Sequence, residues 1–349
     1  MSDTPSFTRL TDLAARDVGG AVVWANDEFF GEKEALIRPE LPTFSPHTFG
    51  HKGQVVDGWE TRRRRPGGPG VQGTEHDSAI IRLGIPGVVR GVTVDTAFFI
   101  GNYPPHARVE AASVPGFPTP ADLLAAEWTE IVPVSPLSGD CEHHFAVEAA
   151  GGAERRFTHV RLAMIPDGGI ARFRVYGEPV PDPRFLAGVP VDLAALTNGA
   201  QIVAASNMFF SAPENLIKPG ESRVMGEGWE TARRRDGVGD WIEVRLAAQG
   251  VPAVIEIDTA NYKGNAPDHI VLLGADRPGE PAGSDWFEVI GQSSMLPDYR
   301  HRFRLDDARP VTHLRLEVRP DGGVARLRVL GTLTDSGLAA VQARWQDNA

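Results

Sequence analysis

Five blocks of this chain occur twice, in the same order and over nearly its whole length. Such a repetition constrains the fold more than any single motif does, because each copy must be able to form the same domain. The chain has 349 residues, which is long enough for two ordinary domains. We therefore predict two copies of one domain. The paired blocks are 21–37 with 201–217, 57–65 with 227–235, 94–105 with 257–268, 127–132 with 285–290, and 159–177 with 313–331.

The segments between and after these blocks set the domain boundaries. The segment between the copies is rich in proline and is typical of a linker, with a helical turn predicted at 191–196. The tail has apolar residues at helical spacing behind a cap at Asp335 or Ser336, which predicts a short helix. In chain order we predict a first repeat at 1–180, a linker at 181–198, a second repeat at 199–333 and a helical tail at 334–349.

The segments inside each repeat are short, alternate in polarity and are rich in β-branched residues. WIEVRLA, AVIEIDTA and HIVLLGA are examples, and Pro, Gly and Asp separate them. This pattern predicts antiparallel strands. A PDGG sequence joins HLRLEVR to VARLRVLG and predicts a hairpin. Because the crossover helices of a parallel sheet are missing from the pattern, we expect an all-β chain of two tandem jelly-roll β-sandwich domains.

The composition narrows the class of partner. Apolar residues make up 42% of the chain and charged residues 23%, which is typical of a soluble globular protein. The formal net charge of -11 argues against nucleic acid or an anionic membrane as a partner. The single cysteine, Cys141, excludes an internal disulfide and fits a reducing compartment. With no secretory signal pattern and no apolar run of about 18 residues, we expect a cytoplasmic protein.

The repeated motif DGWETRRRR and EGWETARRR is the first candidate for a site. Each copy places a tryptophan, a glutamate and consecutive arginines within one short stretch. Arginine binds carboxylates through planar, bidentate hydrogen bonds, which favours a small organic anion as the ligand. Because neighbouring residues of a strand face opposite sides, only part of each arginine run is expected to reach a pocket. The predicted substrate-binding residues of this motif are Trp59, Arg63, Arg64, Trp229, Arg233 and Arg234.

The glutamates of the motif, Glu60 and Glu230, allow two interpretations. They either orient the arginines or act as acid/base groups, and the residue pattern does not separate these roles. The competing interpretation of the arginines themselves is a solvated charge run. That alternative is weakened because GWET accompanies the arginines in both copies.

A second repeated block, DTAFFIGN and DTANYKGN, combines the end of a strand with a turn. Asp95 and Asp258 fall where the strand stops, and Asn102 and Asn265 follow in the loop. Loops at the ends of a rigid sandwich are the usual place for a binding site. We predict Asp95 and Asp258 as catalytic candidates and the two asparagines as substrate ligands. The alternative is that all four satisfy loop backbone groups.

The sequence predicts no metal site. His47 and His51 have a metal-compatible spacing, but Gly50 and nearby prolines argue against a helix there, and no three-ligand set is apparent. No motif requires a cofactor, and a divalent metal is left open. Phosphate-loop, nucleophile-elbow and dinucleotide-binding motifs are also missing.

The duplicated motifs resemble those of the allantoicase family. The resemblance rests on GWETRRR and GWETARRR, DTAFFIGN and DTANYKGN, the segment ASNMFFSAPENLIKPG and the repeated PDGG, and it covers both halves of the chain. It implies two galactose-binding-like jelly rolls, assembly into homo-oligomers, and hydrolysis of allantoate to (S)-ureidoglycolate and urea in purine degradation. The first copy has a longer segment at 39–53 than the second has at 221–227, which suggests unequal roles for the two halves.

The chemistry implied by this resemblance suits the candidate residues. Allantoate carries one carboxylate and two ureido arms on a single carbon, so arginine would hold the carboxylate while asparagine and aspartate hold the ureido groups. Expelling urea requires a proton on the departing nitrogen and a water directed at the central carbon. The acid/base candidates are Glu60, Glu230, Asp95 and Asp258, with His106 and His269 as less favoured ones.

Two other function classes compete with this hypothesis. Tandem domains of this fold also serve as non-catalytic carbohydrate-binding proteins, since a fold does not by itself determine function. The repeated polar block is rich in arginine rather than in exposed aromatic residues, which disfavours sugar binding. The third class is a structural scaffold in which the arginines form interface salt bridges.

Overall fold

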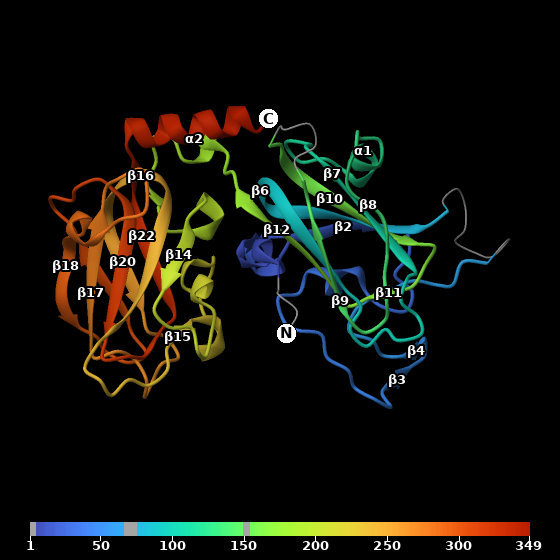
Figure 1. Ribbon diagram of the computed structural model, residues 1–349, viewed down its shortest axis with the longest axis horizontal. Helices are drawn as coiled ribbons and strands as arrows, with labels where there is room; N and C mark the ends of the chain where they lie inside the picture. Colours follow the sequence, from blue (N-terminus) through green and yellow to red (C-terminus); the bar gives the residue numbers. More distant parts are fainter. Residues whose placement is uncertain (1–4, 66–74, 149–153) are drawn as a thin grey trace. The chain divides into compact units, whose positions relative to one another are not determined.

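The chain divides into two compact units. The computed structural model describes residues 5–65, 75–148 and 154–349. The first unit comprises Met1–Val180 with Asp347–Ala349, and the second comprises Pro181–Gln346. Each unit is an all-β sandwich, coloured blue to green and yellow to red respectively in Figure 1.

The elements of the two units follow each other in the same order. The strands of the first unit are β1 (Thr11–Asp12), β2 (Ala21–Ala25), β3 (Phe49–Gly50), β4 (Gly53–Gln54), β5 (Trp59–Glu60), β6 (Asp77–Asp95), β7 (His106–Ala112), β8 (Thr129–Pro136), β9 (Glu142–Ala146), β10 (Arg156–Ile165), β11 (Gly169–Ile170) and β12 (Arg172–Pro179). Its helices are α1 (Pro120–Leu124) and the 3-10 turns η1 (Ser6–Arg9), η2 (Arg16–Val18) and η3 (Lys33–Ile37).

The second unit repeats the strands of this series apart from the hairpin β3–β4, and it has the turn η8 before β15. Its strands are β13 (Val191–Asp192), β14 (Gln201–Ala205), β15 (Trp229–Glu230), β16 (Asp240–Asp258), β17 (His269–Ala275), β18 (Phe287–Ser294), β19 (Arg300–Arg304), β20 (Val311–Arg319), β21 (Gly323–Val324) and β22 (Arg326–Leu333). Its helices are α2 (Asp335–Asp347) and the 3-10 turns η5 (Pro183–Phe185), η6 (Leu196–Asn198), η7 (Pro213–Ile217), η8 (Met225–Glu227) and η9 (Gly283–Asp285).

One long strand organises each sandwich. The first half of β6 lies between β2 and β10, and its second half lies between β12 and β9. The register shifts where the strand passes from one layer to the other: Phe157 of β10 faces Gly87, but His159 faces Arg82. Strand β16 has the same place in the second unit. The expectation of two tandem jelly rolls is confirmed, and each copy bends a single strand through both of its layers.

Two local expectations about strands were wrong. WIEVRLA and AVIEIDTA belong to one continuous strand, β16. The PDGG sequence does not form a hairpin, because β20 and β22 both pair with β16 and not with each other. The glycines of PDGG enter the short strands β11 and β21, which pair with β5 and β15 of the arginine motif.

The segment between the repeats also differs from the expectation of a linker with a helical turn at 191–196. Val191 and Asp192 form β13, which pairs with β22 as β1 pairs with β12. The turn η6 then follows, as η2 follows β1. The second half of 181–198 therefore belongs to the fold of the second unit.

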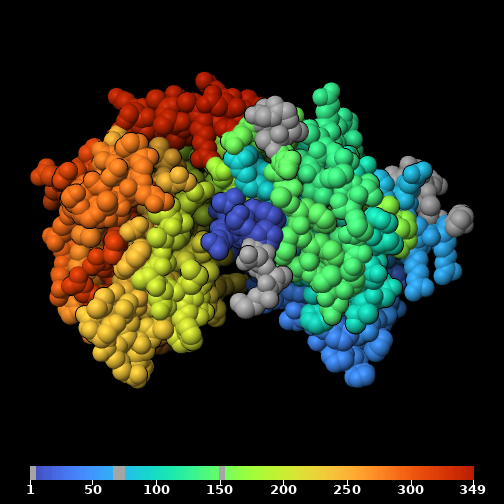
Figure 2. All heavy atoms as spheres, viewed as in Figure 1, coloured from blue at the N-terminus to red at the C-terminus, as the bar shows by residue number. Residues whose placement is uncertain are grey.

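The tail forms the helix α2, but its cap, Thr334, lies one residue before Asp335 and two before Ser336, the two predicted positions. The hydroxyl of Thr334 accepts a hydrogen bond from the backbone N–H of Gly337 at 3.0 Å. Gly337 and Val341 are the buried residues of α2. Figure 2 shows the rest of this helix, in red, on the outer surface.

Candidate active site

Three separate parts of the first repeat meet at one end of its sandwich. Strand β5 carries the arginine motif, and the PDGG loop pairs with it through Gly169 opposite Glu60. The backbone N–H of Thr61 donates to the carbonyl of Gly168 at 3.0 Å, and the N–H of Gly169 donates to the carbonyl of Asn102 at 2.8 Å. Backbone hydrogen bonds thus hold the motif, the PDGG loop and the loop after β6 together.

Steric restrictions explain why both of these PDGG positions are glycine. Gly168 has a φ of 149°, which L side chains rarely adopt. A Cβ on Gly169 would lie 2.1 Å from the ring of Phe99, so the aromatic side chain needs this position free of a side chain. The second repeat shows the same arrangement with Gly323 and Tyr262.

Glu60 and Asn102 form the polar centre of this arrangement. The amide nitrogen of Asn102 donates to the Glu60 carboxylate at 2.8 Å. Burial raises the pKa of Glu60 above its usual value, while the Asn102 hydrogen bond and the charge of Arg63 act in the opposite direction. A raised pKa makes a carboxyl group a better candidate for proton transfer than an ordinary surface glutamate.

The arginines follow β5 outside any strand, and their exposure alternates: Arg62 and Arg64 are half-buried, whereas Arg63 and Arg65 are exposed. Arg64 is internal: its guanidinium donates to the buried carboxylate of Asp77 at 2.6 Å and 2.9 Å. Arg62 pairs with Asp27 at 2.8 Å. Arg63 and Arg65 are exposed, and within the described part of the chain neither forms an ion pair. Of the two arginines predicted to bind substrate, Arg63 is therefore open to a ligand and Arg64 is engaged by Asp77.

A cavity of about 1180 Å³ lies beside Glu60, Arg63 and Asn102, which all line it. Part of its lining comes from the longer segment of the first repeat, including Thr43, Phe44 and Lys52. Phe44 of this segment stacks on Phe98 with 5.7 Å between ring centroids. Figure 1 shows the hairpin β3–β4 of the same segment projecting from the end of the first sandwich.

The cavity wall contains a further cation and a strained residue. Lys52, at the tip of β3–β4, lines the cavity and lies 5.3 Å from the ring centroid of Phe29. Phe98 has a φ of 66°, which is unusual for a bulky residue, whereas the equivalent Asn261 with a φ of 72° is of a type that tolerates this region. Such strain is concentrated at functional sites in proteins.

A buried arginine fastens the added segment to the motif. Arg172 pairs with the Asp57 carboxylate at 2.8 Å and donates to the carbonyl of Glu40 at 2.9 Å. The same carboxylate accepts the N–H of Thr43 at 2.9 Å. Burial raises the pKa of Asp57, but the hydrogen bonds from Arg172 and Thr43 outweigh it and the pKa is lowered. Asp57 is therefore held ionised as a structural anchor.

The predicted tryptophans lie behind the site. Trp59 and Trp229 are both fully buried. The indole N–H of Trp59 donates to the carbonyl of Asp27, and that of Trp229 donates to the carbonyl of Asn207, each at 2.8 Å. This placement corrects the expectation of direct ligand contact, because a side chain with no accessible surface can only position the glutamate next to it.

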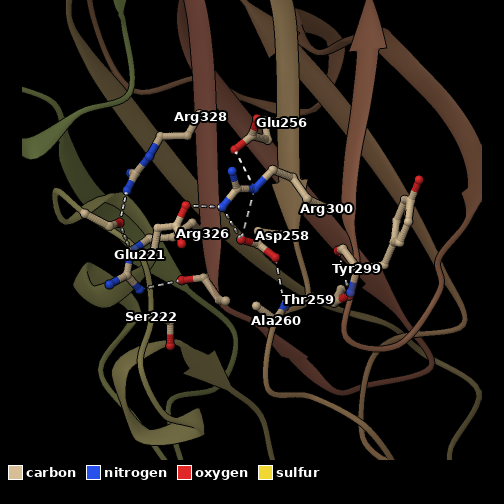
Figure 3. Close-up of polar contacts among 12 residues, drawn as sticks. Glu221, Ser222, Glu256, Asp258, Thr259, Ala260, Tyr299, Arg300, Arg326 and Arg328 are labelled. Carbon is tan, nitrogen blue, oxygen red and sulfur yellow. Dashed lines mark hydrogen bonds and ion pairs between the residues drawn. The ribbon is translucent and has the colours of Figure 1, made fainter.

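The predicted aspartates, Asp95 and Asp258, also lie apart from the cavity wall. Each is buried and accepts a hydrogen bond from the backbone N–H two residues later, at 2.8 Å. Burial raises the pKa of Asp95. Figure 3 shows Asp258 beside Arg300, with 3.4 Å between its carboxylate and the guanidinium. The structure thus favours the loop-capping alternative for both aspartates.

The second repeat keeps the polar centre but surrounds it differently. Asn265 donates to Glu230 at 2.6 Å, and Arg234 pairs with the buried Asp240 at 2.8 Å. Arg233 is exposed, like Arg63. The sulfur of Met225 lies 3.6 Å from the amide nitrogen of Asn265. The short turn η8 therefore occupies the place beside the Glu230–Asn265 pair.

The histidine candidates do not join either site. His106 is exposed and His269 half-buried, each at the first position of its strand. Across residues 5–65, 75–148 and 154–349, no group of three or more His, Cys, Asp or Glu side chains could hold a metal ion. No helix within the same residues is long and apolar enough to cross a membrane.

Several functional residues were missed at the sequence level. Lys52 and Phe44 lie in the segment without a counterpart, so no repetition marked them. Asp77 carries no motif of its own. Arg172 did have a signal, since the block IARFRVYG and its copy VARLRVLG repeat this arginine.

The fold and its cavity define a protein of two tandem jelly-roll sandwiches with a polar, arginine-flanked site at the end of the first. A model of the allantoicase repeat matches residues 11–180 and 191–334. The chain belongs to the allantoicase family.

Individual relatives agree over nearly the whole chain. A probable allantoicase of Streptomyces coelicolor is 50% identical, over 99% of this chain and 91% of its own length. A probable allantoicase of Nocardia farcinica is 48% identical, over 94% of this chain and 95% of its own length. The crystal structure of allantoicase from Saccharomyces cerevisiae superimposes with a TM-score of 0.77 at 35% identity and covers 92% of each chain.

Proposed function

We propose that the chain is an allantoicase that hydrolyses allantoate to (S)-ureidoglycolate and urea in purine degradation, and that its active site is the cavity of the first repeat. The observation that carries this assignment is the meeting of Glu60, Arg63 and Asn102 in one cavity. Family membership supports the reaction. It also favours a hydrolase over the alternative of a non-catalytic carbohydrate-binding protein.

Each of the three residues has a distinct role in this proposal. Arg63 binds the substrate carboxylate, because it is a bidentate donor without an ion pair in the described residues. Asn102 directs its amide toward Glu60 and keeps the carboxyl oriented. Glu60 exchanges protons with the substrate. Lys52 adds positive charge to the lining of the cavity, which suits an anionic substrate.

The reaction is balanced with Glu60 alone as acid and base. Protonated Glu60 gives its proton to the departing ureido nitrogen, and the bond between that nitrogen and the central carbon breaks to release urea. The lone pair of the remaining ureido nitrogen forms a C=N bond, and the positive charge lies next to the newly ionised Glu60. Water then adds to the carbon and returns a proton to Glu60, which yields ureidoglycolate.

The cellular context follows from composition and from the family resemblance. The single cysteine and the net charge of -11 support a cytoplasmic location. The family resemblance supports a homo-oligomer. Apolar side chains exposed around the cavity mouth, such as Phe44 and Ile100, would be compatible with a subunit contact.

The test is urea release from allantoate by the purified full chain and by two matched variants. Glu60→Gln keeps the shape of the side chain but cannot donate a proton, so we expect kcat to fall roughly 10²–10⁴-fold. Glu230→Gln is the same change in the second repeat and should stay within a few-fold of the wild type. Equal losses in the two variants would contradict the choice of the first repeat, and a wild-type chain that releases no urea would contradict the function.

A further inference from the structure

The second repeat keeps the glutamate, arginine and asparagine of the proposed site, although it has no counterpart of Lys52. Glu230, Arg233 and Asn265 match Glu60, Arg63 and Asn102 in the aligned motifs. The Asn265–Glu230 hydrogen bond of 2.6 Å reproduces the Asn102–Glu60 bond of 2.8 Å. Arg233 is exposed, and among the described residues it has no ion pair. The second repeat therefore contains the donors and the acceptor of a ureido-acid site.

A segment of the same chain lies against the amide of this second set of residues. In place of the long segment of the first repeat, residues 222–227 form a short loop that ends in η8. Its Met225 directs the sulfur to within 3.6 Å of the Asn265 amide nitrogen. In the first repeat the corresponding Asn102 lines an open cavity. The Met225 side chain thus contacts the amide that would bind a ligand oxygen. We call residues 222–227 the plug.

Side chains specific to the second repeat fasten the plug. The Tyr262 hydroxyl donates to the carbonyl of Met225 at 2.7 Å, and Asn261 donates to the carbonyl of Ser222 at 3.0 Å. Asn215 donates to the carbonyl of Gly226 at 3.2 Å. Within the plug, Arg223 pairs with Glu227.

The first repeat has no equivalent of these fastening groups. The positions aligned with Asn215, Asn261 and Tyr262 are Ala35, Phe98 and Phe99, none of which has a polar side-chain atom. Phe98 instead stacks on Phe44 of the longer segment and so forms part of the cavity wall. The difference between the repeats is therefore concentrated in the residues that hold the plug, while the Glu–Asn–Arg set is unchanged.

From this contrast we infer that the second repeat holds a second site for ureido carboxylates which the Met225 plug keeps filled, so that each chain binds one substrate molecule rather than two. The inference rests on the proposed function, because it assigns the same ligand chemistry to both repeats. It accounts for the unequal length of the segment before each arginine motif. It also predicts that the second site can be opened by a change outside both polar sets.

The experiment measures allantoate binding by titration calorimetry on the full chain. Glu60→Gln serves as the parent, since it should slow turnover strongly, and it should bind one allantoate per chain. Adding Arg63→Gln should abolish that binding. Adding Met225→Gly to this double variant should restore binding, with an affinity at least tenfold above that of the double variant and one allantoate per chain. A further Arg233→Gln should remove this binding.

Two controls keep the outcomes separate. Met225→Ala in the otherwise wild-type chain should leave urea release within about twofold, and thermal melting of every variant should show a folded chain. Two equivalent binding events in the Glu60→Gln parent would overturn the inference. So would a folded Met225→Gly variant without restored binding. If Met225→Gly does not fold, Met225→Ala in the same double variant provides the same comparison. Loss of urea release in the wild type would instead count against the proposed function.

Discussion

Arg63 and Arg64 are neighbours in one motif but meet different surroundings. Arg64 points inward to Asp77, and both side chains of this pair are less than a tenth exposed. Arg63 points outward along the cavity wall beside Glu60. At the scale of single residues, adjacent positions thus divide one arginine run into a structural cation and an exposed cation, to which we assign ligand binding.

The charge of Arg63 should be visible in the pH dependence of activity. Arg63 lowers the pKa of Glu60, so its removal should raise that pKa further. In the proposed mechanism Glu60 begins the reaction protonated, so activity should be lost as the pH rises through this pKa. We expect Arg63→Gln to move the alkaline limb of the kcat/KM profile to higher pH, in addition to raising KM.

Arg63→Lys is the matched control for this prediction. Lysine keeps the charge, so the alkaline limb should stay in place, but it lacks the planar fork, so KM should still rise. An alkaline limb that is the same in Arg63→Gln and the wild type would show that Glu60 does not supply the proton.

At the scale of elements, β10 and β20 each carry a buried histidine at the same position, His159 and His313. Burial, followed by the charge of Arg82, lowers the pKa of His159 to about 4. Burial likewise lowers the pKa of His313. Both imidazoles are therefore neutral in the folded state at neutral pH, and protonation opposes folding.

His159 should accordingly make stability depend on pH. The unfolded chain binds the proton near pH 6.5, whereas the folded chain binds it only near pH 4. The contribution of neutral His159 to the free energy of unfolding is therefore fully present above about pH 6.5. It is lost as the pH falls toward 4, and it amounts to about 3 kcal/mol. We expect the denaturation midpoint of His159→Gln, followed by circular dichroism, to change less between these pH values than that of the wild type. An unchanged slope would show that other groups dominate acid unfolding.

The sequence predicted the elements better than their connections. Alternating polarity located the strands correctly, because alternation is a local property of a strand with one buried face. It could not show that β16 continues through WIEVRLA and AVIEIDTA, since a bend between layers resembles a turn. PDGG was misjudged as a hairpin for a related reason. Its glycines serve a contact with Phe99, which lies about seventy residues earlier in the chain.

The candidate site was predictable only in part, for a similar physical reason. Repetition singled out Glu60, Arg63 and Asn102, and the structure brings all three together. Repetition equally marked Trp59 and Asp95, which have structural roles. The Trp59 indole is buried and donates to a backbone carbonyl, and the Asp95 carboxylate accepts a backbone N–H at the end of its strand. Lys52 was missed because it comes from the unrepeated segment. A repeated residue can therefore be structural, whereas an unrepeated one can distinguish the two halves.

At the scale of the whole molecule, each unit contains its own core and its own buried aspartate paired with an arginine. Arg64–Asp77 and Arg234–Asp240 have equivalent places in the two sandwiches. Removing one arginine leaves a buried carboxylate without its cation, which typically costs about 3–5 kcal/mol. Each loss should weaken mainly the unit in which it occurs.

Hydrogen exchange can test this separation. Arg64→Met should increase amide exchange in β6 and β10 and leave β16 and β20 near their wild-type protection. Arg63→Met, the adjacent exposed change, should alter neither set. Equal loss of protection in both units after Arg64→Met would mean that the chain unfolds as one cooperative body.

The main-chain bonds around PDGG have one more consequence. Thr61, Gly168, Gly169 and Asn102 are joined through peptide groups, and the second copy repeats the bond from Gly323 to Asn265. Peptide groups are the same whatever side chains they carry, so mutation can exchange the surrounding residues without moving the frame. After the duplication, one copy could thus stay open to solutes while the other was sealed, with no redesign of the scaffold beneath either of them.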